Sequence, residues 1–374
     1  MSDIFSAKDP QKALQRAHEF IREGKRDAAI KVLEDNLTED NESFDLFQEL
    51  ARLYYDAEER VHAVGLLRRL HNIVPSRTDE IIAQLSEMYY SHTSIDAGEF
   101  LIQLYTSQQK YEEISKILAV LNEHEINLLI TKYEKMTQGI EDKNVILKSD
   151  LENTIVFASL KFSQGAGEMG SAAVGPVLGI DVFKKPLLNW ARILGRERYN
   201  DPHAALLLLK VQVANGVFDD ALTQSQRIFE KFPNVSEVLI DVLSAVKPPP
   251  DLQPNYTQML TDLYITKGDL ATSIDQLKQM LEKDTKDIDA VIKDLRKLEV
   301  VNPRDLKVLY TLAQAYLRSK RYSLAINELD KIFEIDNEQY DEVLMLYKQA
   351  FEQKKNDPFV IQGLVNLYFK HDEI

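Results

Sequence analysis

The sequence contains no cysteine, which excludes disulfide bonds, thiolate metal sites and cysteine nucleophiles. Glycine and proline are both scarce, with 13 and 12 residues in 374, and there is a single tryptophan. No stretch approaches the ~18 apolar residues of a membrane span, and the first residues lack the basic start and apolar run of a secretory signal. Because residues that break helices are few, we expect an all-α protein in the cytoplasm.

Acidic residues outnumber basic residues by 60 to 45, which gives a formal net charge of −15. Such a charge repels phosphate backbones, so we expect no nucleic-acid partner. The seven histidines are scattered, and no two of them stand four residues apart around a glutamate, the pattern of a zinc-hydrolase helix. The sequence also lacks a G-x-S-x-G elbow and a phosphate-binding loop. We therefore predict no metal site, no cofactor and no enzymatic activity.

The N-terminal third repeats with a period of 34 residues, which Ala29, Ala63 and Ala97 mark. Each alanine stands early in the second of two amphipathic patterns, with apolar residues at i, i+3, i+4 and i+7. In the clearest copy, over 44–75, the positions of this pattern are Phe47, Leu50, Ala51, Tyr54, Ala63, Leu67 and Leu70. A period of this length predicts stacked helix-turn-helix units.

A second period, of 52 residues, runs through the C-terminal half. Its large apolar positions are Leu208, Leu260, Leu312 and Leu364, and its small positions are Ala221, Ser273 and Ala325. Because 52 residues are about three helix-and-turn steps, we expect one extra helix in each of these units. Four pairs of a capping residue and a proline predict helix starts, at Asp9-Pro10, Asp201-Pro202, Asn302-Pro303 and Asp357-Pro358.

Two segments, 205–233 and 308–337, resemble tetratricopeptide repeats. Their first helix has the order large residue, Leu, small residue and Tyr or a polar residue, and their second helix carries an aromatic residue and then Ala. The copy over 44–75 is similar, and the resemblance extends over roughly 10–137 and 202–370. It implies an α-solenoid of helix-turn-helix repeats that binds a protein or peptide in the concave groove formed by the first helices.

The register of the repeats predicts which side chains face that groove. They are His18, Arg22, Gln48, Arg52, Tyr55, Tyr89, Tyr90, Tyr310, Gln314 and Arg318. Arginine and tyrosine are enriched at protein interfaces, because arginine binds carboxylates through two donors and tyrosine is a rigid amphipathic contact. We therefore expect a non-enzymatic scaffold or adaptor for protein partners. The sequence leaves open whether the chain forms a homo-oligomer.

The helical period lapses between the two repeat regions. We therefore predict N-terminal repeats over 1–139, an irregular glycine-rich insert over 140–183, and C-terminal repeats with extra helices over 184–374.

A short glycine-rich motif lies inside this insert. A β-leaning run, 154–162, is followed by Gly165 to Gly170 in the form G-x-G-x-x-G, which is formally a dinucleotide-binding fingerprint. Pro176 and Gly179 interrupt the helix that this fingerprint requires. A loop or an inserted hairpin is therefore favoured over a nucleotide-binding enzyme.

The most basic short segment follows the insert and contains the only tryptophan. Its members are Lys184, Lys185, Trp190, Arg192, Arg196 and Arg198. One interpretation is an amphipathic helix that binds an acidic partner or lies on an anionic membrane surface, as in a peripheral membrane adaptor. The favoured interpretation is that Leu187, Leu188, Ile193 and Leu194 are core, that Trp190 fills a junction, and that the charges form a solvated face.

Overall fold

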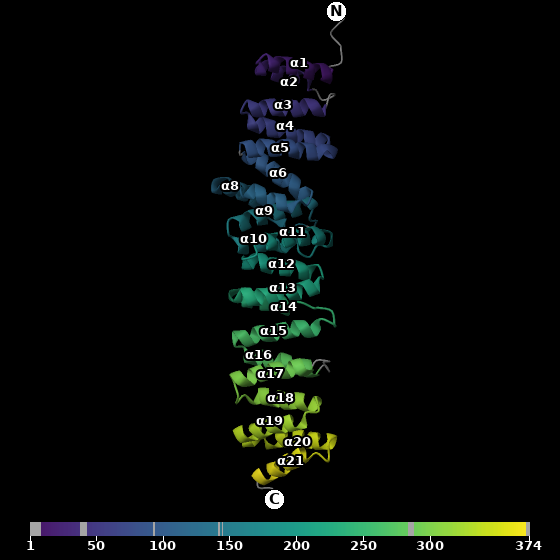
Figure 1. The fold of residues 1–374 in the computed structure, drawn as a ribbon, viewed down its shortest axis with the longest axis vertical. Coiled ribbons are helices and arrows are strands. Elements are labelled where there is room, and N and C mark those ends of the chain that lie inside the picture. Colours follow the sequence, from purple (N-terminus) through teal and green to yellow (C-terminus); the bar gives the residue numbers. More distant parts are fainter. Residues whose placement is uncertain are drawn as a thin grey trace, which may run out of the picture. The chain divides into compact units, whose positions relative to one another are not determined.

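The structure is a computed structural model that describes residues 9–37, 43–92, 94–140, 143, 145–282 and 288–371. Every regular element in these residues is an α-helix or a short 3-10 helix, so the all-α prediction is confirmed. The chain divides into two compact units, Met1–Asn215 and Gly216–Ile374. Within each unit, successive helices stack on one another (Figure 1).

Unit 1 contains twelve of the α-helices in the described residues. They are α1 (Pro10–Arg22), α2 (Arg26–Asn36), α3 (Phe44–Asp56), α4 (Arg60–Ile73), α5 (Thr78–Ser91), α6 (Ile95–Ser107), α7 (Tyr111–Leu118), α8 (Glu123–Thr137), α9 (Lys148–Ser163), α10 (Gly167–Ala173), α11 (Lys184–Glu197) and α12 (Pro202–Ala214). The first six form three hairpins, α1 with α2, α3 with α4 and α5 with α6, as the 34-residue period predicts.

Unit 2 contains the remaining nine. They are α13 (Phe218–Lys231), α14 (Ser236–Ser244), α15 (Gln253–Lys267), α16 (Leu270–Glu282), α17 (Ile288–Val301), α18 (Leu306–Arg318), α19 (Tyr322–Ile335), α20 (Tyr340–Gln353) and α21 (Pro358–Lys370). The extra helix predicted for each 52-residue unit is present as α14, α17 and α20. Its apolar positions, including Leu239, Leu243, Val291 and Leu295, are buried.

Small residues at the repeated positions lie where helices approach closely. The alanines that mark the 34-residue period are completely buried, as are Ala221, Ser273 and Ala325 of the 52-residue period. A small side chain at each of these places lets neighbouring helix backbones come near one another, so that the larger apolar residues on either side interlock. Both periods read from the sequence are therefore confirmed in the packing.

Aspartate caps begin helices where three of the capping pairs predict them. Oδ1 of Asp9, Asp201 and Asp357 accepts a hydrogen bond from the backbone amide two residues later, at 3.1, 2.8 and 3.0 Å respectively. Each cap satisfies an amide that the helix itself leaves without a partner, while the following proline has no amide to satisfy.

The start predicted at Asn302-Pro303 is wrong. Helix α17 continues to Val301, and α18 begins at Leu306. Asp305 is the cap, because its Oδ1 accepts a hydrogen bond from the amide of Lys307 at 2.9 Å. The side chain that reaches the first free amides decides the start of the helix, and a nearby proline does not.

The predicted irregular insert is also wrong over most of its length. Residues 154–162, interpreted as β-leaning, lie in α9, and all nine of them are buried. A helix covered on every side has no polar stripe, so its sequence loses the 3.6-residue pattern and does not differ from a buried strand. Helix α9 therefore belongs to the core of unit 1.

The glycine motif brings α10 close to α9. Gly165 occupies a left-handed turn between the two helices, with φ of 79°. A Cβ atom at Gly170 would lie 2.8 Å from Cδ2 of Phe162 on α9. The dinucleotide interpretation needs a strand before these glycines, and α9 stands in that place. The glycines allow two helices to touch, and the nucleotide-binding alternative is contradicted.

The N-terminus of α9 supports a prediction about acid stability. Asp150 is buried, and its carboxylate accepts hydrogen bonds from Nζ of Lys143 at 2.5 Å and from the amide of Leu147 at 2.8 Å. Burial acts to raise the pKa of Asp150, but Lys143 and the amide together hold it below its usual value. Its contribution to stability is therefore present above the pKa of the unfolded chain and is lost as the pH falls through the lower pKa of the folded state.

We expect Asp150→Asn to lower the free energy of unfolding more at pH 7 than in acid. The gap between wild type and variant should narrow as the pH falls below about 4, the pKa of aspartate in the unfolded chain, and should close below the lowered pKa of the folded state. Urea denaturation of both proteins at pH 7, 5 and 3 measures this gap. A gap of constant size would show that the charge of Asp150 does not stabilise the fold.

Candidate functional site

The exposed sides of α1, α3, α5, α7 and α11 are linked by side-chain contacts, and we call this surface the first-helix face. Helices α1 and α3 meet where Nε2 of His18 lies 3.5 Å from Oε1 of Glu49. Helices α3 and α5 meet where Nε2 of Gln84 donates to the carbonyl of Gln48 at 2.9 Å. The predicted groove residues of unit 1 therefore come from helices that adjoin.

The face continues from α5 to α7 and α11. Nζ of Lys110, which precedes α7, lies 3.5 Å from Oδ1 of Asp79 on α5. Arg196 on α11 forms an ion pair with Glu112 on α7, and the hydroxyl of Ser115 on α7 donates to Glu197 on α11. The two contacts between α7 and α11 join residues more than eighty positions apart in the sequence. The basic segment that follows the glycine motif therefore borders the same face as the repeat residues.

The arginines at the N-terminal end of the face are exposed. Arg52 donates to Oε1 of Glu49 at 2.8 Å, and this oxygen also faces His18. More than half of the Arg52 side chain is exposed to solvent, and Arg22 at the end of α1 is exposed as well. Exposed ion pairs of this kind contribute only a few tenths of a kcal/mol to stability, so the guanidinium groups are able to change partner.

Two tyrosines of the face differ in how firmly they are held. The hydroxyl of Tyr55 donates to the carbonyl of Met88, and its ring meets His92 edge to face, with ring centroids 6.1 Å apart. Tyr90 is 57 % exposed and touches the ring of Tyr89. Burial raises the pKa of both Tyr55 and Tyr90, so both hydroxyls remain neutral donors at neutral pH.

The prediction that Tyr89 faces the groove is wrong, because its side chain is completely buried. Its hydroxyl donates to the carbonyl of Ile117 at 3.1 Å, and its ring lies over Gly98 on α6. A Cβ atom at Gly98 would lie 2.9 Å from the ring. The 34-residue period contains the signal for this difference, because the position equivalent to Gly98 in the previous repeat is Val64. Glycine there makes room for a ring that would otherwise point outward.

The groove residues predicted in unit 2 lie on α18. Arg318 is exposed, whereas Tyr310 and Gln314 are half-buried. The hydroxyl of Tyr310 donates to Oε1 of Gln339 at 3.4 Å, and burial raises its pKa to about 12. These side chains belong to the second compact unit, whereas the site described above consists of residues of unit 1.

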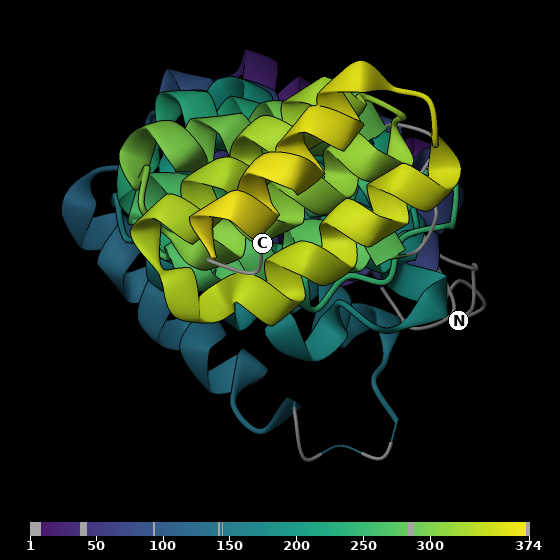
Figure 2. The same cartoon turned by 90° about the horizontal axis from the view of Figure 1, so that it is seen from below.

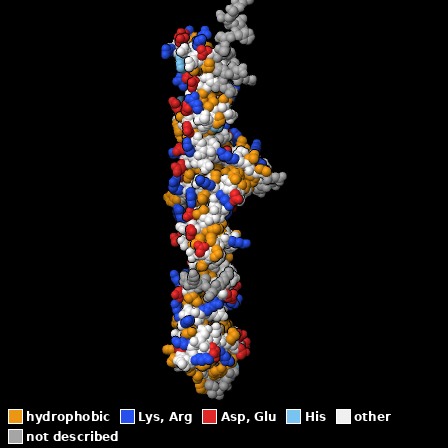
Figure 3. Space-filling model, turned by 90° about the vertical axis from the view of Figure 1, so that its right-hand side faces the viewer, with side chains coloured by type: hydrophobic (Ala, Val, Ile, Leu, Met, Phe, Trp, Pro, Cys, Tyr) orange, Lys and Arg blue, Asp and Glu red, His pale blue; other side chains and the backbone are white. Residues whose placement is uncertain are grey.

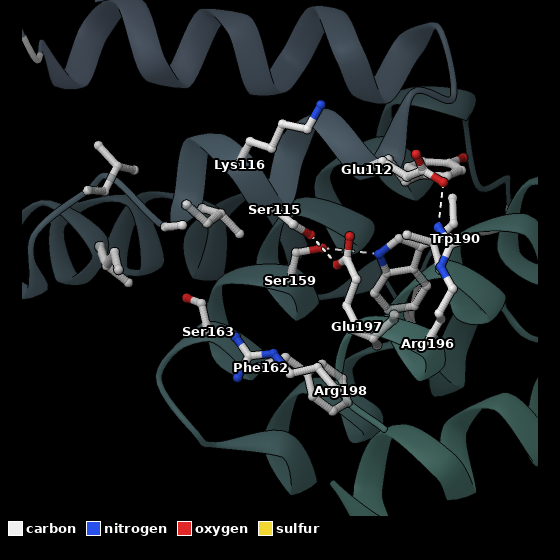
Figure 4. A pocket seen from close by; sticks show the side chains of 17 residues that line it. Glu112, Ser115, Lys116, Ser159, Phe162, Ser163, Trp190, Arg196, Glu197 and Arg198 are labelled. Atoms are coloured by element: carbon white, nitrogen blue, oxygen red, sulfur yellow. Dashed lines mark hydrogen bonds and ion pairs between the residues drawn. The ribbon is translucent and has the colours of Figure 1, made fainter. Parts of the chain in front are cut away.

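A cavity of about 800 Å³ opens between α7, α8, α9 and α11, next to the first-helix face (Figure 4). Its apolar lining includes Trp190, Phe162 and Leu194, all of which are buried. The indole Nε1 of Trp190 donates to Oγ of Ser159 at 3.1 Å, which fixes the ring. We call this cavity the Trp190 pocket. Sequence reasoning missed it, because its walls come from four helices whose order in the chain does not reveal that they meet.

Charged side chains surround the Trp190 pocket. Lys116 pairs with Glu113 at 2.6 Å, and Arg196 pairs with Glu112. The hydrogen bond that Lys116 donates to Glu113 raises the pKa of Lys116. Arg198 also lines the pocket and is half-buried. Within the part of the chain that the structure describes, its guanidinium makes no ion pair or hydrogen bond. The pocket therefore combines an apolar lining with one positive charge that has no partner among the described residues.

The structure decides between the two interpretations of the basic segment. Leu187, Leu188, Trp190 and Leu194 are buried in unit 1, which confirms that they are core, whereas Ile193 is half-buried. Trp190 is consequently not part of a surface patch. The apolar side of α11 is not available to enter a bilayer, so the peripheral-membrane interpretation loses the feature on which it depended.

The charged members of that segment behave as a solvated face. Lys184 pairs with Asp181 at 2.7 Å, and Lys185 and Arg192 are exposed. Across the described ranges, no group of three or more His, Asp or Glu side chains is placed to hold a metal ion. In the same residues, no helix has the length and apolar character needed to cross a membrane.

Comparisons with known proteins give matches among solved structures alone. No protein-family model matches the sequence, and no curated protein sequence matches it. The chain is similar to the crystal structure of the yeast Tom70, with 11 % identity over 97 % of this chain and 89 % of that one, at a TM-score of 0.19. It is also similar to the crystal structure of the P58(IPK) TPR domain, with 13 % identity over 98 % of this chain and 99 % of that one, at the same TM-score of 0.19. Scores this low add no argument to the one that the helix hairpins make themselves.

Proposed function

We propose that this protein is a non-enzymatic scaffold that binds a protein segment along the first-helix face of unit 1. The observation that carries the proposal is the Trp190 pocket beside that face, with its apolar lining and the unpartnered guanidinium of Arg198. Its volume lies in the range of pockets that hold a ligand group. On the side of the molecule drawn in Figure 3, acidic and basic side chains are interspersed with apolar ones.

The chemistry of the pocket indicates what it would hold. Trp190 and Phe162 favour an aromatic or large aliphatic side chain, because rings and aliphatic groups gain most from leaving water. Arg198 favours a carboxylate beside that side chain, since a charge-assisted hydrogen bond is roughly twice as strong as a neutral one. The partner segment would therefore place an apolar anchor next to Asp or Glu.

The polar groups of the pocket support binding and not catalysis. The hydroxyl of Ser159 accepts the indole N–H of Trp190, and the hydroxyl of Ser115 donates to Glu197. Within the described residues lining the pocket, no serine has a histidine beside it to act as a general base. A reaction would also need water to be excluded, whereas the exposed side chains of Glu112 and Arg196 line this pocket, so it is open to solvent.

The test uses the fact that Trp190 is the only tryptophan, so its fluorescence reports on the pocket. Peptides selected from a random display library on the full chain should carry an aromatic or aliphatic residue next to Asp or Glu, and their binding should shift the emission of Trp190. Arg198→Glu should weaken the binding of these peptides at least tenfold. Lys185→Glu is the matched control, because it makes the same charge change at the other end of α11, which Arg198 caps, and lies outside the pocket.

A second variant examines the other end of the face. Arg52→Glu should weaken the binding of longer partner segments that reach α3. The variant should keep the helical circular dichroism signal of wild type, because Arg52 is exposed and not part of the core. Tyr55 is not a suitable site for this purpose, since its hydroxyl is bonded to the carbonyl of Met88. Selected peptides that bind wild type and Arg198→Glu equally well would contradict the proposal.

A further inference from the structure

Another cavity, with a volume of about 480 Å³, opens between α13 and α15 of unit 2. Its apolar lining includes Leu222 and Phe229, and its charged lining consists of Glu230 and Asp262. Among the described residues that line it there is no lysine, arginine or histidine. We call this cavity the Glu230 crevice.

The 52-residue period allows the crevice to be compared with the same place in the later repeats. The caps of α18 and α21, Asp305 and Asp357, are 52 residues apart, so these helices are equivalent, and α15 precedes α18 by one period. The helices equivalent to α13 are α16 and α19. In Figure 2, α20 and α21 lie nearest the viewer in yellow, with the green helices of unit 2 behind them.

The apolar lining of the crevice is less well covered than its equivalents. Leu222 and Phe229 on α13 are half-buried. One and two periods later the corresponding residues are all buried, namely Ile274, Leu281, Ile326 and Phe333. The apolar surface that is hidden on α16 and α19 therefore remains partly open on α13.

One position on the facing helix accounts for this difference. It is Met259 on α15, Thr311 on α18 and Gly363 on α21. A Cβ atom at Gly363 would lie 2.8 Å from Cγ2 of Ile326 on α19, so α21 approaches α19 closely. The longer side chain of Met259 does not permit such an approach between α15 and α13, and it lines the crevice that results.

A glutamate recurs at the charged position of the crevice, as Glu230, Glu282 and Glu334. In the last of these repeats, Nζ of Lys370 on α21 donates to Oε1 of Glu334 at 3.2 Å. The residue of α15 at the position of Lys370 is Thr266, which has no charge. Within the part of the chain that is described, Glu230 makes no ion pair or hydrogen bond. The fold thus pairs this glutamate with a basic side chain in one repeat and leaves it without one at the crevice.

We propose that the Glu230 crevice binds a lysine or arginine side chain of a partner protein. The positive group would pair with Glu230 as Lys370 pairs with Glu334. The aliphatic stem would cover Leu222 and Phe229, because lysine and arginine can bury the stem while the charged end stays in contact with water. The ring of Phe229 also attracts a cation that lies over its face. A basic side chain therefore fits both the apolar and the charged part of the lining.

The second carboxylate of the crevice, Asp262, already has a partner. Nζ of Lys297 lies 3.1 Å from Oδ1 of Asp262 and 2.7 Å from Oδ1 of Asp294. Because one lysine is shared between two carboxylates, the surroundings of the crevice keep an excess of negative charge. This excess, together with the net charge of −15, attracts a basic segment, so added salt should weaken the complex.

Peptides selected from a random display library on the full chain test the proposal. Those that also bind Thr266→Lys are removed, because this variant places a lysine where α21 has Lys370 and so gives Glu230 a partner from its own chain. The peptides that remain should contain lysine or arginine. Thr266 is exposed on α15, so the variant should fold like wild type, which circular dichroism checks.

Fluorescence anisotropy of the labelled peptides gives their affinities. Glu230→Gln should weaken binding at least tenfold. Replacing the basic residue of the peptide with norleucine should have a similar effect, because norleucine keeps an aliphatic stem and removes the charge. Glu282→Gln is the matched control, because Glu282 is the exposed equivalent of Glu230 one period later, and this variant should bind the peptides like wild type.

The crevice belongs to unit 2, so these measurements do not depend on the Trp190 pocket of unit 1. Remaining peptides that contain neither lysine nor arginine would overturn the proposal, as would equal affinities for wild type and Glu230→Gln. A selection in which every peptide binds Thr266→Lys as well as wild type would overturn it too.

Discussion

Replacing Trp190 with alanine should lower the free energy of unfolding by about 3–5 kcal/mol, the range measured for large aromatic residues in protein cores. The side chain is 3 % exposed and lies among buried residues of α9 and α11. Removing the ring extends the existing pocket into the core and leaves the hydroxyl of Ser159 without the indole donor at 3.1 Å. Urea denaturation followed by far-ultraviolet circular dichroism measures the loss, because the variant has no tryptophan fluorescence.

Trp190→Phe is the control for this measurement. It keeps most of the apolar ring and removes the hydrogen bond to Ser159, so its loss should be clearly smaller than that of the alanine variant. An alanine variant within about 1 kcal/mol of wild type would show that the ring is not a core residue. In that case the apolar side of α11 would be available to a membrane surface, as the peripheral-membrane interpretation requires.

In unit 2, Tyr347→Ala should also lower the free energy of unfolding by about 3–5 kcal/mol. Tyr347 on α20 is completely buried, and its hydroxyl donates to Oδ1 of Asp330 on α19 at 2.9 Å. On α21, Gly363 lies against its ring, since a Cβ atom there would be 2.8 Å from Cε1. The residue therefore joins three helices, and its removal leaves a cavity that none of them is placed to fill. Chemical denaturation of wild type and variant gives the difference.

Tyr347→Phe separates the ring from the hydroxyl. Burial raises the pKa of Asp330, whereas the hydrogen bond from Tyr347 lowers it, so the variant should raise this pKa further. A carboxyl group with a raised pKa in the folded state stabilises the fold below its unfolded pKa, and this contribution is lost as the pH rises through the folded pKa. Tyr347→Phe should consequently lower the free energy of unfolding less at pH 4 than at pH 7. Equal losses at both pH values would contradict this account.

Features that depend on local chemistry could be predicted from the sequence. The caps at Asp9, Asp201 and Asp357 follow from which side chains can accept from the first amides of a helix. The buried alanines and the extra helix of the second half follow from periods that stacking imposes on the sequence. The resemblance to tetratricopeptide repeats agrees with the helix hairpins for the same reason.

Features that depend on contacts between distant segments could not be predicted. Helix α9 is covered on all sides, so the pattern that reveals a helix is missing from it. Tyr89 lies against Gly98 on the next helix, and although this glycine is visible as a departure from the 34-residue period, the period does not show which ring it admits. The Trp190 pocket depends on α7 meeting α11, and contacts such as that between Ser115 and Glu197 leave no periodic trace in the sequence.

The equivalence of Asp305 and Asp357 has a consequence for how such a chain changes its length. A segment that begins at one of these caps and stops just before the next contains its own start signal, its small residues and its three helices. A tandem duplication of the gene over 305–356 would therefore add a whole building block and leave every existing junction chemically unchanged. The array is therefore extensible by copying, with one small residue needed at the new junction, where Thr311 of the second copy would take the place of Gly363 against the ring of Tyr347.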